Sequence, residues 1–254
     1  MAGLKGTNIK RIGHNDLEYL EKVLKEVKEQ YQTKLVIIDG VYSQDGDLSL
    51  LPEIASLCKA YEAILMLDDA HGIGVMGANG RGTAEHYNCL GQIDIITGTF
   101  SKSFGCVGGF AAASKKIIQY LRFYADSNVF SAAPTPQVTA SILKALEIMK
   151  KEPQIRTKLW ENTNHLRRRL KEEGFDIGKS VSPIFPIMIR DNKKVYEIAK
   201  MLQEKGIFTI GIVYPAVRTK EARLRVSVLA THKLEQLDAL VNALNDINKN
   251  IKIK

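Results

Sequence analysis

A chain of 254 residues, 45% of them hydrophobic and 25% charged, is long and apolar enough to bury a core in one or two domains, which excludes a disordered protein. The net charge of +8 comes from lysines and arginines that are scattered among acids, so nucleic acid is not the expected partner. The one basic run, "RRRLK" at 167–171, is interpreted as the solvated face of a helix because no aromatic residues interleave with it.

The first part of the chain alternates helical and strand patterns. Leucines and valines at helical spacing follow the candidate N-caps Asn15 and Asp16, and Pro52 suits the first turn of a later helix. Short apolar runs rich in branched residues predict buried strands. In chain order we expect a helix at 15–31, a strand at 34–42, a helix at 48–62, strands at 63–72, 93–100 and 107–114, and helices at 114–125 and 135–150.

This alternation predicts parallel crossover units, and therefore an α/β domain with a mostly parallel sheet and helices on both of its faces. In such sheets ligands bind beyond the carboxyl ends of the strands. Three of the apolar runs end in residues that can do chemistry, at 39–43, 68–71 and 99–102. The sequence therefore predicts a site at this edge of the sheet.

The pattern changes near residue 152, where we place a domain boundary between a larger domain at 1–152 and a smaller α+β domain at 153–254. The strict alternation of 222–230 is typical of an antiparallel strand with one face covered by helices. The expected elements are a helix at 153–175, a strand at 182–190, a helix at 193–206, strands at 207–213 and 222–230, and a helix at 233–249.

Cysteine spacing and hydropathy indicate a cytoplasmic protein. Three cysteines without CxxC spacing predict neither a disulfide framework nor a metal site. No stretch reaches the roughly 18 apolar residues of a membrane span, and the N-terminus lacks the apolar region of a signal peptide. Peripheral contact with a membrane surface is the one kind of membrane association that the sequence leaves as an alternative.

The stretch "GTFSKSFGCVGG" places Lys102 among small and hydroxyl residues directly after a predicted strand. A lysine amine that loses its charge can attack a carbonyl and form a Schiff base. Pyridoxal phosphate (PLP) is the candidate carbonyl, and it needs a carboxylate for its ring nitrogen and donors for its phosphate. Asp68 suits the ring nitrogen, His71 the ring oxygen, and Thr99 and Ser101 the phosphate. Asp68 alone is also typical of a turn cap and His71 of a buried histidine, but the combination favours a PLP site.

Six blocks of the sequence together resemble the α-oxoamine synthase family, which consists of class II aminotransferase-like PLP enzymes. In chain order the blocks are "DGVYSQDGD", "LDDAHGIGVMG", "GRGTAEH", "TFSKSFGCVG", "VFSAAPTP" and "ARLRVSVLATH". Such enzymes are biosynthetic acyltransferases: they condense an amino acid with an acyl-CoA, release carbon dioxide and CoA, and yield an aminoketone. The resemblance implies the PLP-dependent transferase fold of type I, here with a partial large domain and a small C-terminal domain.

The resemblance also assigns roles to the residues at the PLP lysine block and the strand before it. Lys102 would be the Schiff-base lysine and the catalytic base. Asp68 would pair with the pyridine nitrogen and His71 with the ring oxygen. Thr99 would contact the phosphate, as Ser101 would from its position beside the lysine.

Further roles implied by the resemblance fall outside this block. Ser43 would lie beside the cofactor, and Ser131 would reach the phosphate held by the neighbouring subunit of a homodimer with composite active sites. Arg225 would hold the substrate carboxylate, which a planar guanidinium fork matches. Arg223 lies on the same face of the predicted strand, so spacing alone does not separate the two arginines.

The sequence departs from the family pattern at its start. Family members carry a long N-terminal region with a phosphate-binding turn and a histidine that stacks on the ring, and residue 1 falls after it; His14 matches a later block. We therefore expect a fragment, a split-gene product or a truncated form, with a reduced but complete enzyme as the alternative. Gln44 stands where the family usually has methionine. A non-catalytic subunit that binds a full-length homologue and an aminotransferase with the same cofactor site are the alternative functions.

The blocks also bear on which synthase the chain resembles. "GGF", "GRGTAEH" and "SVLATH" look most like bacterial serine palmitoyltransferases, which use serine, whereas "IVYPAV" is similar to glycine C-acetyltransferase. An 8-amino-7-oxononanoate synthase stays an alternative. The amino-acid substrate is therefore expected to be serine, glycine or alanine.

Overall fold

A computed structural model describes residues 8–253, which divide into two compact units. Unit 1 runs to Gly40 and resumes over Ser49–Lys151, whereas unit 2 combines Val41–Leu48 with the chain from Glu152 onward. Each unit encloses a hydrophobic core of its own. No helix among the described residues has both the length and the apolar composition needed to cross a lipid bilayer.

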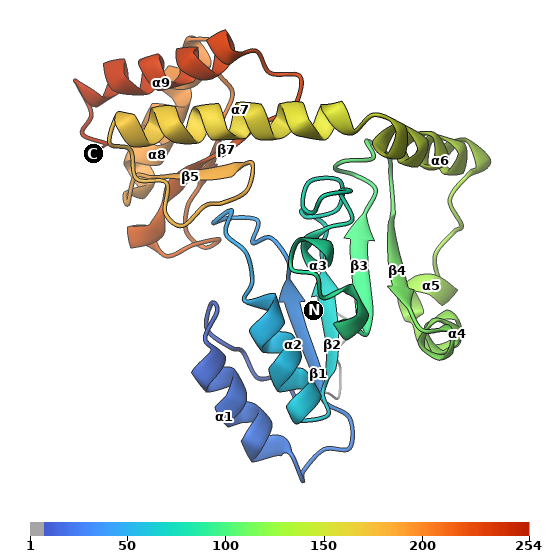
Figure 1. Cartoon of the computed structure of the whole chain (residues 1–254). Coiled ribbons are helices and arrows are strands. Elements are labelled where there is room, and N and C mark those ends of the chain that lie inside the picture. Colours follow the sequence, from blue (N-terminus) through green and yellow to red (C-terminus); the bar gives the residue numbers. More distant parts are fainter. Residues whose placement is uncertain (1–7, 254) are drawn as a thin grey trace. The chain divides into compact units, whose positions relative to one another are not determined.

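Unit 1 is built on a four-stranded sheet in the order β1-β2-β3-β4 (Figure 1). Its strands are β1 (Leu35–Asp39), β2 (Ile64–Asp68), β3 (Ile95–Thr99) and β4 (Gly109–Ala113). Its helices are α1 (Leu17–Val27), α2 (Leu51–Ala60), α3 (Thr83–His86), α4 (Lys115–Tyr124), α5 (Asp126–Val129) and α6 (Pro136–Lys151), with a 3-10 turn at Leu90–Gln92. Asp16 is the N-cap of α1 and accepts a hydrogen bond from the Tyr19 N–H.

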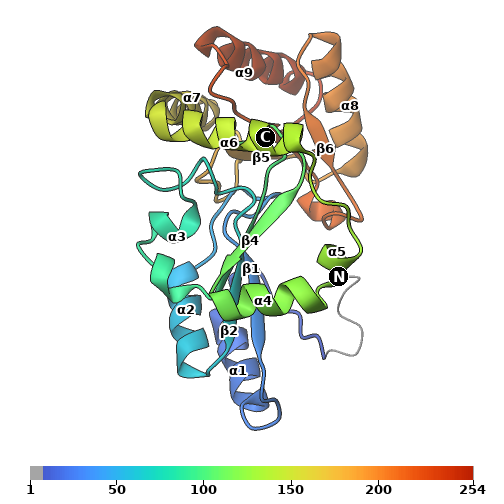
Figure 2. The same ribbon diagram turned by 90° about the vertical axis from the view of Figure 1, so that its right-hand side faces the viewer.

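The sheet is mostly parallel, as predicted, but its last strand reverses direction. Strand β2 pairs in parallel with both β1 and β3, whereas β4 runs antiparallel to β3 and lies at the edge of the sheet beside α4 (Figure 2). The connection from β3 to β4 spans only residues 100–108. A parallel crossover needs about a dozen residues or more, so this connection can only return as a hairpin.

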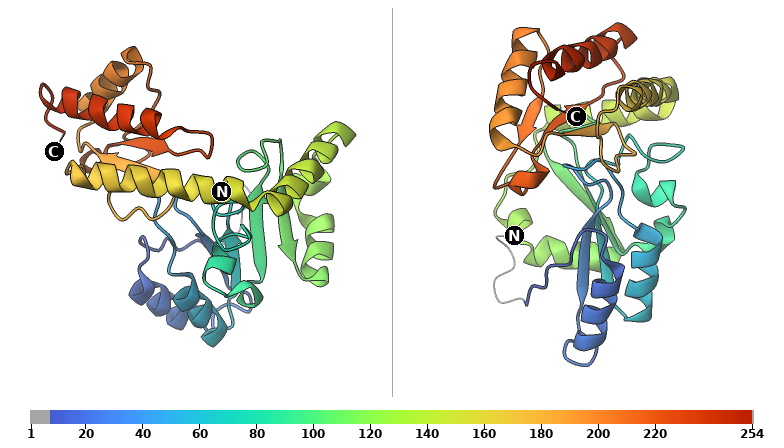
Figure 3. Two further views of the ribbon diagram at one scale, coloured as in Figure 1. Left: turned by 45° about the horizontal axis from the view of Figure 1, so that its top comes forward. Right: turned by 90° about the vertical axis from the view of Figure 1, so that its left-hand side faces the viewer.

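Helices α1 and α2 cover one face of the sheet (Figure 3). Their leucines and isoleucines pack against Leu65 and Leu67 of β2, both of which are fully buried. On the opposite face, Leu35 and Ile37 of β1 remain 46% and 51% exposed. The expectation of helices on both faces is therefore wrong for β1 within residues 8–253. Right-handed crossovers that advance through β1, β2 and β3 in one direction place their helices on one face.

Unit 2 is a three-stranded antiparallel sheet in the order β5-β7-β6, covered by three helices. The strands are β5 (Ile184–Met188), β6 (Ile210–Ile212) and β7 (Arg223–Ser227); the helices are α7 (Pro153–Glu172), α8 (Asn192–Glu204) and α9 (Leu234–Asn248), with a 3-10 turn at Thr219–Glu221. Alternate residues of β5 and β7, including Phe185 and Leu224, enter the core beneath the helices. The remaining residues, Arg223 and Arg225 among them, face the other side of this sheet.

The segment Val41–Leu48 belongs with unit 2 because its backbone is bonded there. The Gly46 carbonyl oxygen accepts hydrogen bonds of 3.1 Å from the N–H groups of Val181 and Ser182. Gly46 has a φ of +68°, and a Cβ at this position would overlap with the Ile184 carbonyl oxygen. Glycine is thus required for the close approach of the two backbones.

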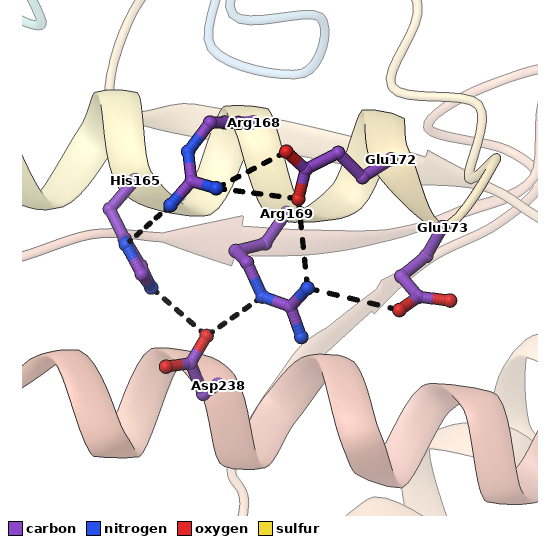
Figure 4. Close-up of polar contacts among 6 residues, drawn as sticks. All are labelled: His165, Arg168, Arg169, Glu172, Glu173 and Asp238. Carbon is purple, nitrogen blue, oxygen red and sulfur yellow. Dashed lines mark hydrogen bonds and ion pairs between the residues drawn. The ribbon is translucent and has the colours of Figure 1, made fainter.

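The basic run on α7 is engaged in ion pairs with α7 and α9 (Figure 4). Asp238 Oδ1 accepts hydrogen bonds from Arg169 Nε at 3.0 Å and from His165 Nε2 at 2.9 Å, and Arg168 Nη1 lies 3.2 Å from Glu172 Oε1. Two arginines of the run therefore face carboxylates of their own unit. This arrangement supports the interpretation of the run as a helix face rather than a phosphate-binding patch.

Candidate functional site

Two carboxylates lie side by side where β1 and β2 end. The parallel register of these strands pairs Asp39 with Asp68, and on its other side Asp68 pairs with Thr97 of β3. Both acids thus occupy the carboxyl edge of the sheet, where the sequence predicts a site. Asp68 Oδ1 accepts a hydrogen bond of 3.0 Å from the Ala70 N–H, which holds the carboxylate at the start of the following turn.

The charge of Lys102 acts on Asp39. Burial raises the pKa of Asp39, the negative charge of Asp68 raises it further, and the positive charge of Lys102 lowers it. Asp68 and Lys102 thus both act electrostatically on the same carboxylate. Asp39 was missing from the predicted site residues, although its position at the end of an apolar run was a usable signal.

The hydroxyl groups of Thr99 and Ser101 gather just before Lys102. The Thr99 hydroxyl donates to the Gly108 carbonyl oxygen at 3.2 Å and accepts from the Ser101 N–H at 3.1 Å. Its Oγ1 lies 2.8 Å from Ser101 Oγ. Lys102 itself lies in the exposed part of the β3–β4 loop. The loop thus presents two adjacent hydroxyls and an amine.

The turn after β2 contains His71 and a second acid, Asp69. His71 is half-buried, and Asp69 is fully buried. The Asp69 carboxylate accepts hydrogen bonds from the Thr83 N–H at 2.7 Å and from the Thr83 hydroxyl at 2.6 Å. Burial raises the pKa of Asp69 to about 6, although the hydrogen bonds from Thr83 act in the opposite direction.

Ser131 lies in the connection between α5 and α6 of unit 1. It is exposed there. Its role toward a neighbouring subunit stays a prediction.

In unit 2 the structure brings Ser43 and Arg225 together. Arg225 Nε donates a hydrogen bond of 2.6 Å to the Ser43 carbonyl oxygen, and its Nη1 donates one of 3.1 Å to Ser227 Oγ. Burial lowers the pKa of the Arg225 guanidinium. Its Nη2 has no hydrogen-bond acceptor among residues 8–253, so this part of the guanidinium can receive a carboxylate.

Arg223 and Arg225 differ in burial and in hydrogen-bond partners, and these differences distinguish their roles, which their spacing in the sequence does not. Arg223 is 3% exposed and forms an ion pair with Asp45. Its guanidinium also donates to the carbonyl oxygens of Glu221 at 2.7 Å and Gln44 at 3.3 Å. Arg223 therefore holds the segment Val41–Leu48 in unit 2, and Arg225 is the better candidate for a ligand.

Comparisons with known proteins find relatives that match nearly the whole of this chain. An 8-amino-7-oxononanoate synthase of Thermoanaerobacter pseudethanolicus is 44% identical over 240 residues, which cover 94% of this chain and 61% of that protein. A serine palmitoyltransferase of Sphingobacterium spiritivorum is 43% identical over 251 residues, 99% of this chain and 63% of that protein. The chain thus spans about three fifths of the length of these relatives, at 61% and 63%.

The fold expected from the resemblance is confirmed by a solved structure of serine palmitoyltransferase (SPT) with PLP. It is 31% identical and superposes with a TM-score of 0.92 over 98% of this chain and 63% of that chain. The family model described as aminotransferase class I and II matches residues 2–244. The chain therefore belongs to the aminotransferase class I and II family.

Proposed function

We propose that the chain contributes the PLP lysine, its acid partner and the carboxylate-binding arginine of an α-oxoamine synthase. Such an enzyme condenses serine, glycine or alanine with an acyl-CoA, releases carbon dioxide and CoA, and forms an aminoketone. The observation that carries this proposal is that Asp39 and Asp68 pair at the carboxyl edge of the sheet and that the charge of Lys102, in the loop after β3, acts on Asp39. Relatives named serine palmitoyltransferase and 8-amino-7-oxononanoate synthase support it.

The groups present in unit 1 fit PLP chemically. A carboxylate, an amine and two adjacent hydroxyls match the ring nitrogen, the aldehyde and the phosphate of this cofactor. The loop also has room, because a Cβ added to Gly105 would meet no atom within 4 Å and one added to Gly108 only Phe100 Cδ2 at 3.6 Å. When bound, PLP supplies an aldehyde for amines and a ring that accepts electrons.

The residues of unit 1 handle the protons of the reaction. Asp68 keeps a proton on the ring nitrogen, since a nearby carboxylate favours a cationic partner. His71 would donate a hydrogen bond to the ring oxygen, and Thr99 and Ser101 would contact the phosphate. Lys102 would be the base that removes the α-proton of the amino acid and the acid that returns a proton to the product.

The residues of unit 2 bind the amino acid. Arg225, which already donates to the Ser43 carbonyl oxygen, would hold the substrate carboxylate through its unpaired face, and the resemblance implies a role for Ser43 at the cofactor. Unit 1 would be the PLP-binding domain expected at 1–152, and unit 2, which also takes in Val41–Leu48, the small domain expected at 153–254. Ser131 would reach the phosphate of the second subunit in a homodimer. The acyl-CoA is the second substrate.

Serine palmitoyltransferase is the synthase we favour. The serine palmitoyltransferase relative aligns over 251 residues and the 8-amino-7-oxononanoate synthase relative over 240, at nearly the same identity. Because the two relatives are nearly equally identical to this chain, 8-amino-7-oxononanoate synthase is the second candidate. Incubation with serine and palmitoyl-CoA, and in parallel with alanine or glycine and other acyl-CoA thioesters, distinguishes the two by their products.

Borohydride reduction followed by peptide mapping tests the cofactor site. The wild-type chain is incubated with PLP, reduced, digested and analysed by mass spectrometry, and the label is expected on Lys102. Lys102→Ala is expected to lose it, whereas Lys115→Ala, which removes another lysine of unit 1, should retain it. A label on a different lysine, or no uptake even with a full-length homologue added, would refute the proposal.

A further inference from the structure

The carboxylate of Asp69 is the most completely buried acid near the proposed cofactor site, and the proposed chemistry does not use it. Asp69 is 0% exposed, and both of its oxygens accept hydrogen bonds from a single residue, Thr83. A buried carboxylate is costly unless its hydrogen bonds are made. The burial of a carboxylate directly after Asp68 must therefore be compensated by its contacts within unit 1.

Three glycines close around this carboxylate. A Cβ added to Gly40, Gly72 or Gly82 would overlap with an oxygen of Asp69, and Gly82 also has a φ of +96°. The backbone at each of the three positions therefore approaches the carboxylate as closely as glycine allows. Asp69 is the common point against which three separate segments of unit 1 pack.

These segments carry the residues of the proposed site. Gly40 follows Asp39, and Gly72 follows His71. Backbone hydrogen bonds reinforce the arrangement: the Asp69 N–H donates to the Thr97 carbonyl oxygen of β3 at 2.9 Å, and the Gly40 N–H donates to the Asp68 carbonyl oxygen at 2.8 Å. The ends of β1, β2 and β3 are thus joined around one side chain.

The same network reaches the lysine loop. The Ile73 N–H donates to the Asp69 carbonyl oxygen at 2.9 Å, and the Ile73 carbonyl oxygen accepts from Ser103 Oγ at 2.7 Å. Ser103 directly follows Lys102. The backbone that carries the amine is therefore tied to the turn that Asp69 holds.

We propose that Asp69 is a positioning residue, which through Thr83 and the surrounding glycines sets the relative positions of Asp68, His71 and Lys102. This inference rests on the proposed function, because the positioned groups are those of the PLP site. Asp69 does not touch the cofactor in this role. It acts through the strand ends and the turn that it organises.

The positioning depends on hydrogen bonds rather than on charge. An asparagine at position 69 has the same shape; its carbonyl oxygen can accept from the Thr83 N–H while its amide donates to the Thr83 hydroxyl. Asp69→Asn is therefore expected to keep the arrangement. Thr83→Val removes the hydroxyl and leaves one oxygen of a buried carboxylate without a donor.

The test compares Thr83→Val with Thr83→Ser, which restores the hydroxyl, and with Thr163→Val as a matched control. Thr163 is also 0% exposed, and its hydroxyl donates to the Leu159 carbonyl oxygen at 2.6 Å within α7 of unit 2. Two quantities are measured: hydrogen exchange of residues 39–42 and 69–83 in the chain without PLP, and the apparent pKa of the absorbance band of the PLP-bound chain.

Thr83→Val is expected to speed exchange in both segments by about tenfold, since it removes one hydrogen bond of a buried charged group. The pKa of the PLP band is expected to shift as well, and Thr83→Ser to restore both values. Thr163→Val should lower the thermal midpoint and leave both unchanged. Asp69→Asn should exchange no faster than the wild type in either segment and should leave the PLP titration unchanged.

The inference is overturned if Thr83→Val speeds exchange only next to residue 83 with an unchanged PLP titration, or if Thr163→Val moves the titration equally. It is also overturned if Asp69→Asn disturbs the site as much as Thr83→Val does. Failure of the wild-type chain to take up PLP would refute the proposed function instead. The exchange measurement on the chain without PLP would then still decide whether Asp69 joins the strand ends.

Discussion

Replacing Asp69 by asparagine should change how the stability of unit 1 depends on pH. The variant keeps the shape and both hydrogen bonds to Thr83, but it cannot ionise. The wild-type carboxyl is buried, and burial raises its pKa from 3.8 to about 6. The folded state therefore binds the proton of Asp69 more tightly than the unfolded state does.

The magnitude follows from linkage between protonation and folding. The burial cost of the charge is absent below the unfolded pKa of 3.8, grows as pH rises, and is complete above the folded pKa of about 6. At about 1.4 kcal/mol per pH unit, this shift is worth about 3 kcal/mol. Relative to Asp69→Asn, the wild type should thus lose about 3 kcal/mol of unfolding free energy between about pH 4 and pH 7.

The assay is equilibrium unfolding in urea from pH 4 to pH 7.5. The unfolding free energy of unit 1 is read from hydrogen exchange of its own peptides, so that unit 2 does not contribute. Asp238→Asn, which changes α9 of unit 2 and is read from unit 2 peptides, serves as a control of opposite sign. Burial pushes the pKa of Asp238 upward, but the hydrogen bonds from His165 and Arg169 bring it below its ordinary value. A difference between wild type and Asp69→Asn that is flat with pH, or that grows as pH falls, would refute the reasoning.

Two further predictions concern unit 2. Arg223→Met should lower the unfolding free energy of unit 2 by about 2 kcal/mol or more, because Asp45 loses its partner. Arg225→Met should cost less stability but raise the KM for the amino acid more than about tenfold. Denaturant unfolding, monitored by Trp160 fluorescence, and steady-state kinetics measure the two effects, and equal losses of stability in the two variants would contradict the prediction. Asn162→Ala should destabilise unit 2 by about 2 kcal/mol, because the buried Nδ2 donates to carbonyl oxygens in the turn after β7 at 2.8 and 3.0 Å. The same unfolding assay checks this prediction, and a loss of unfolding free energy below about 0.5 kcal/mol would show that these bonds add little.

The long periodic segments of the fold could be predicted from the sequence. The pattern at 153–175 corresponds to α7, and the alternation at 222–230 to β7, because repeats of 3.6 and 2 residues report which face is buried. Helices α3 and α5 were missed because four residues contain no full period. The reversal of β4 and the bare face of β1 depend on connection length and strand order, which a local pattern does not express.

The site was predictable where chemistry coincides with a strand end. Lys102 and Asp68 lie at or after the ends of apolar runs, so a place at the carboxyl edge of the sheet could be expected for both from topology. From the sequence, Asp69 was as consistent with a turn cap as with a functional acid. Its partner Thr83 lies 14 residues away, in a region without a periodic pattern. Arg223 and Arg225 became distinguishable only through the segment Val41–Leu48, which no local signal connects to β7.

That segment has a consequence for how the molecule can be assembled and divided. The chain leaves unit 1 at Gly40, contributes Val41–Leu48 to unit 2, and returns at Ser49. Asp45 and its partner Arg223 are 178 residues apart in sequence, so unit 2 is completed only after a long loop has closed, and its last contacts should form late in folding. A recombinant 153–254 fragment would expose Arg223 and the surface that Gly46 covers, and a synthetic 41–48 peptide should bind it and restore its stability.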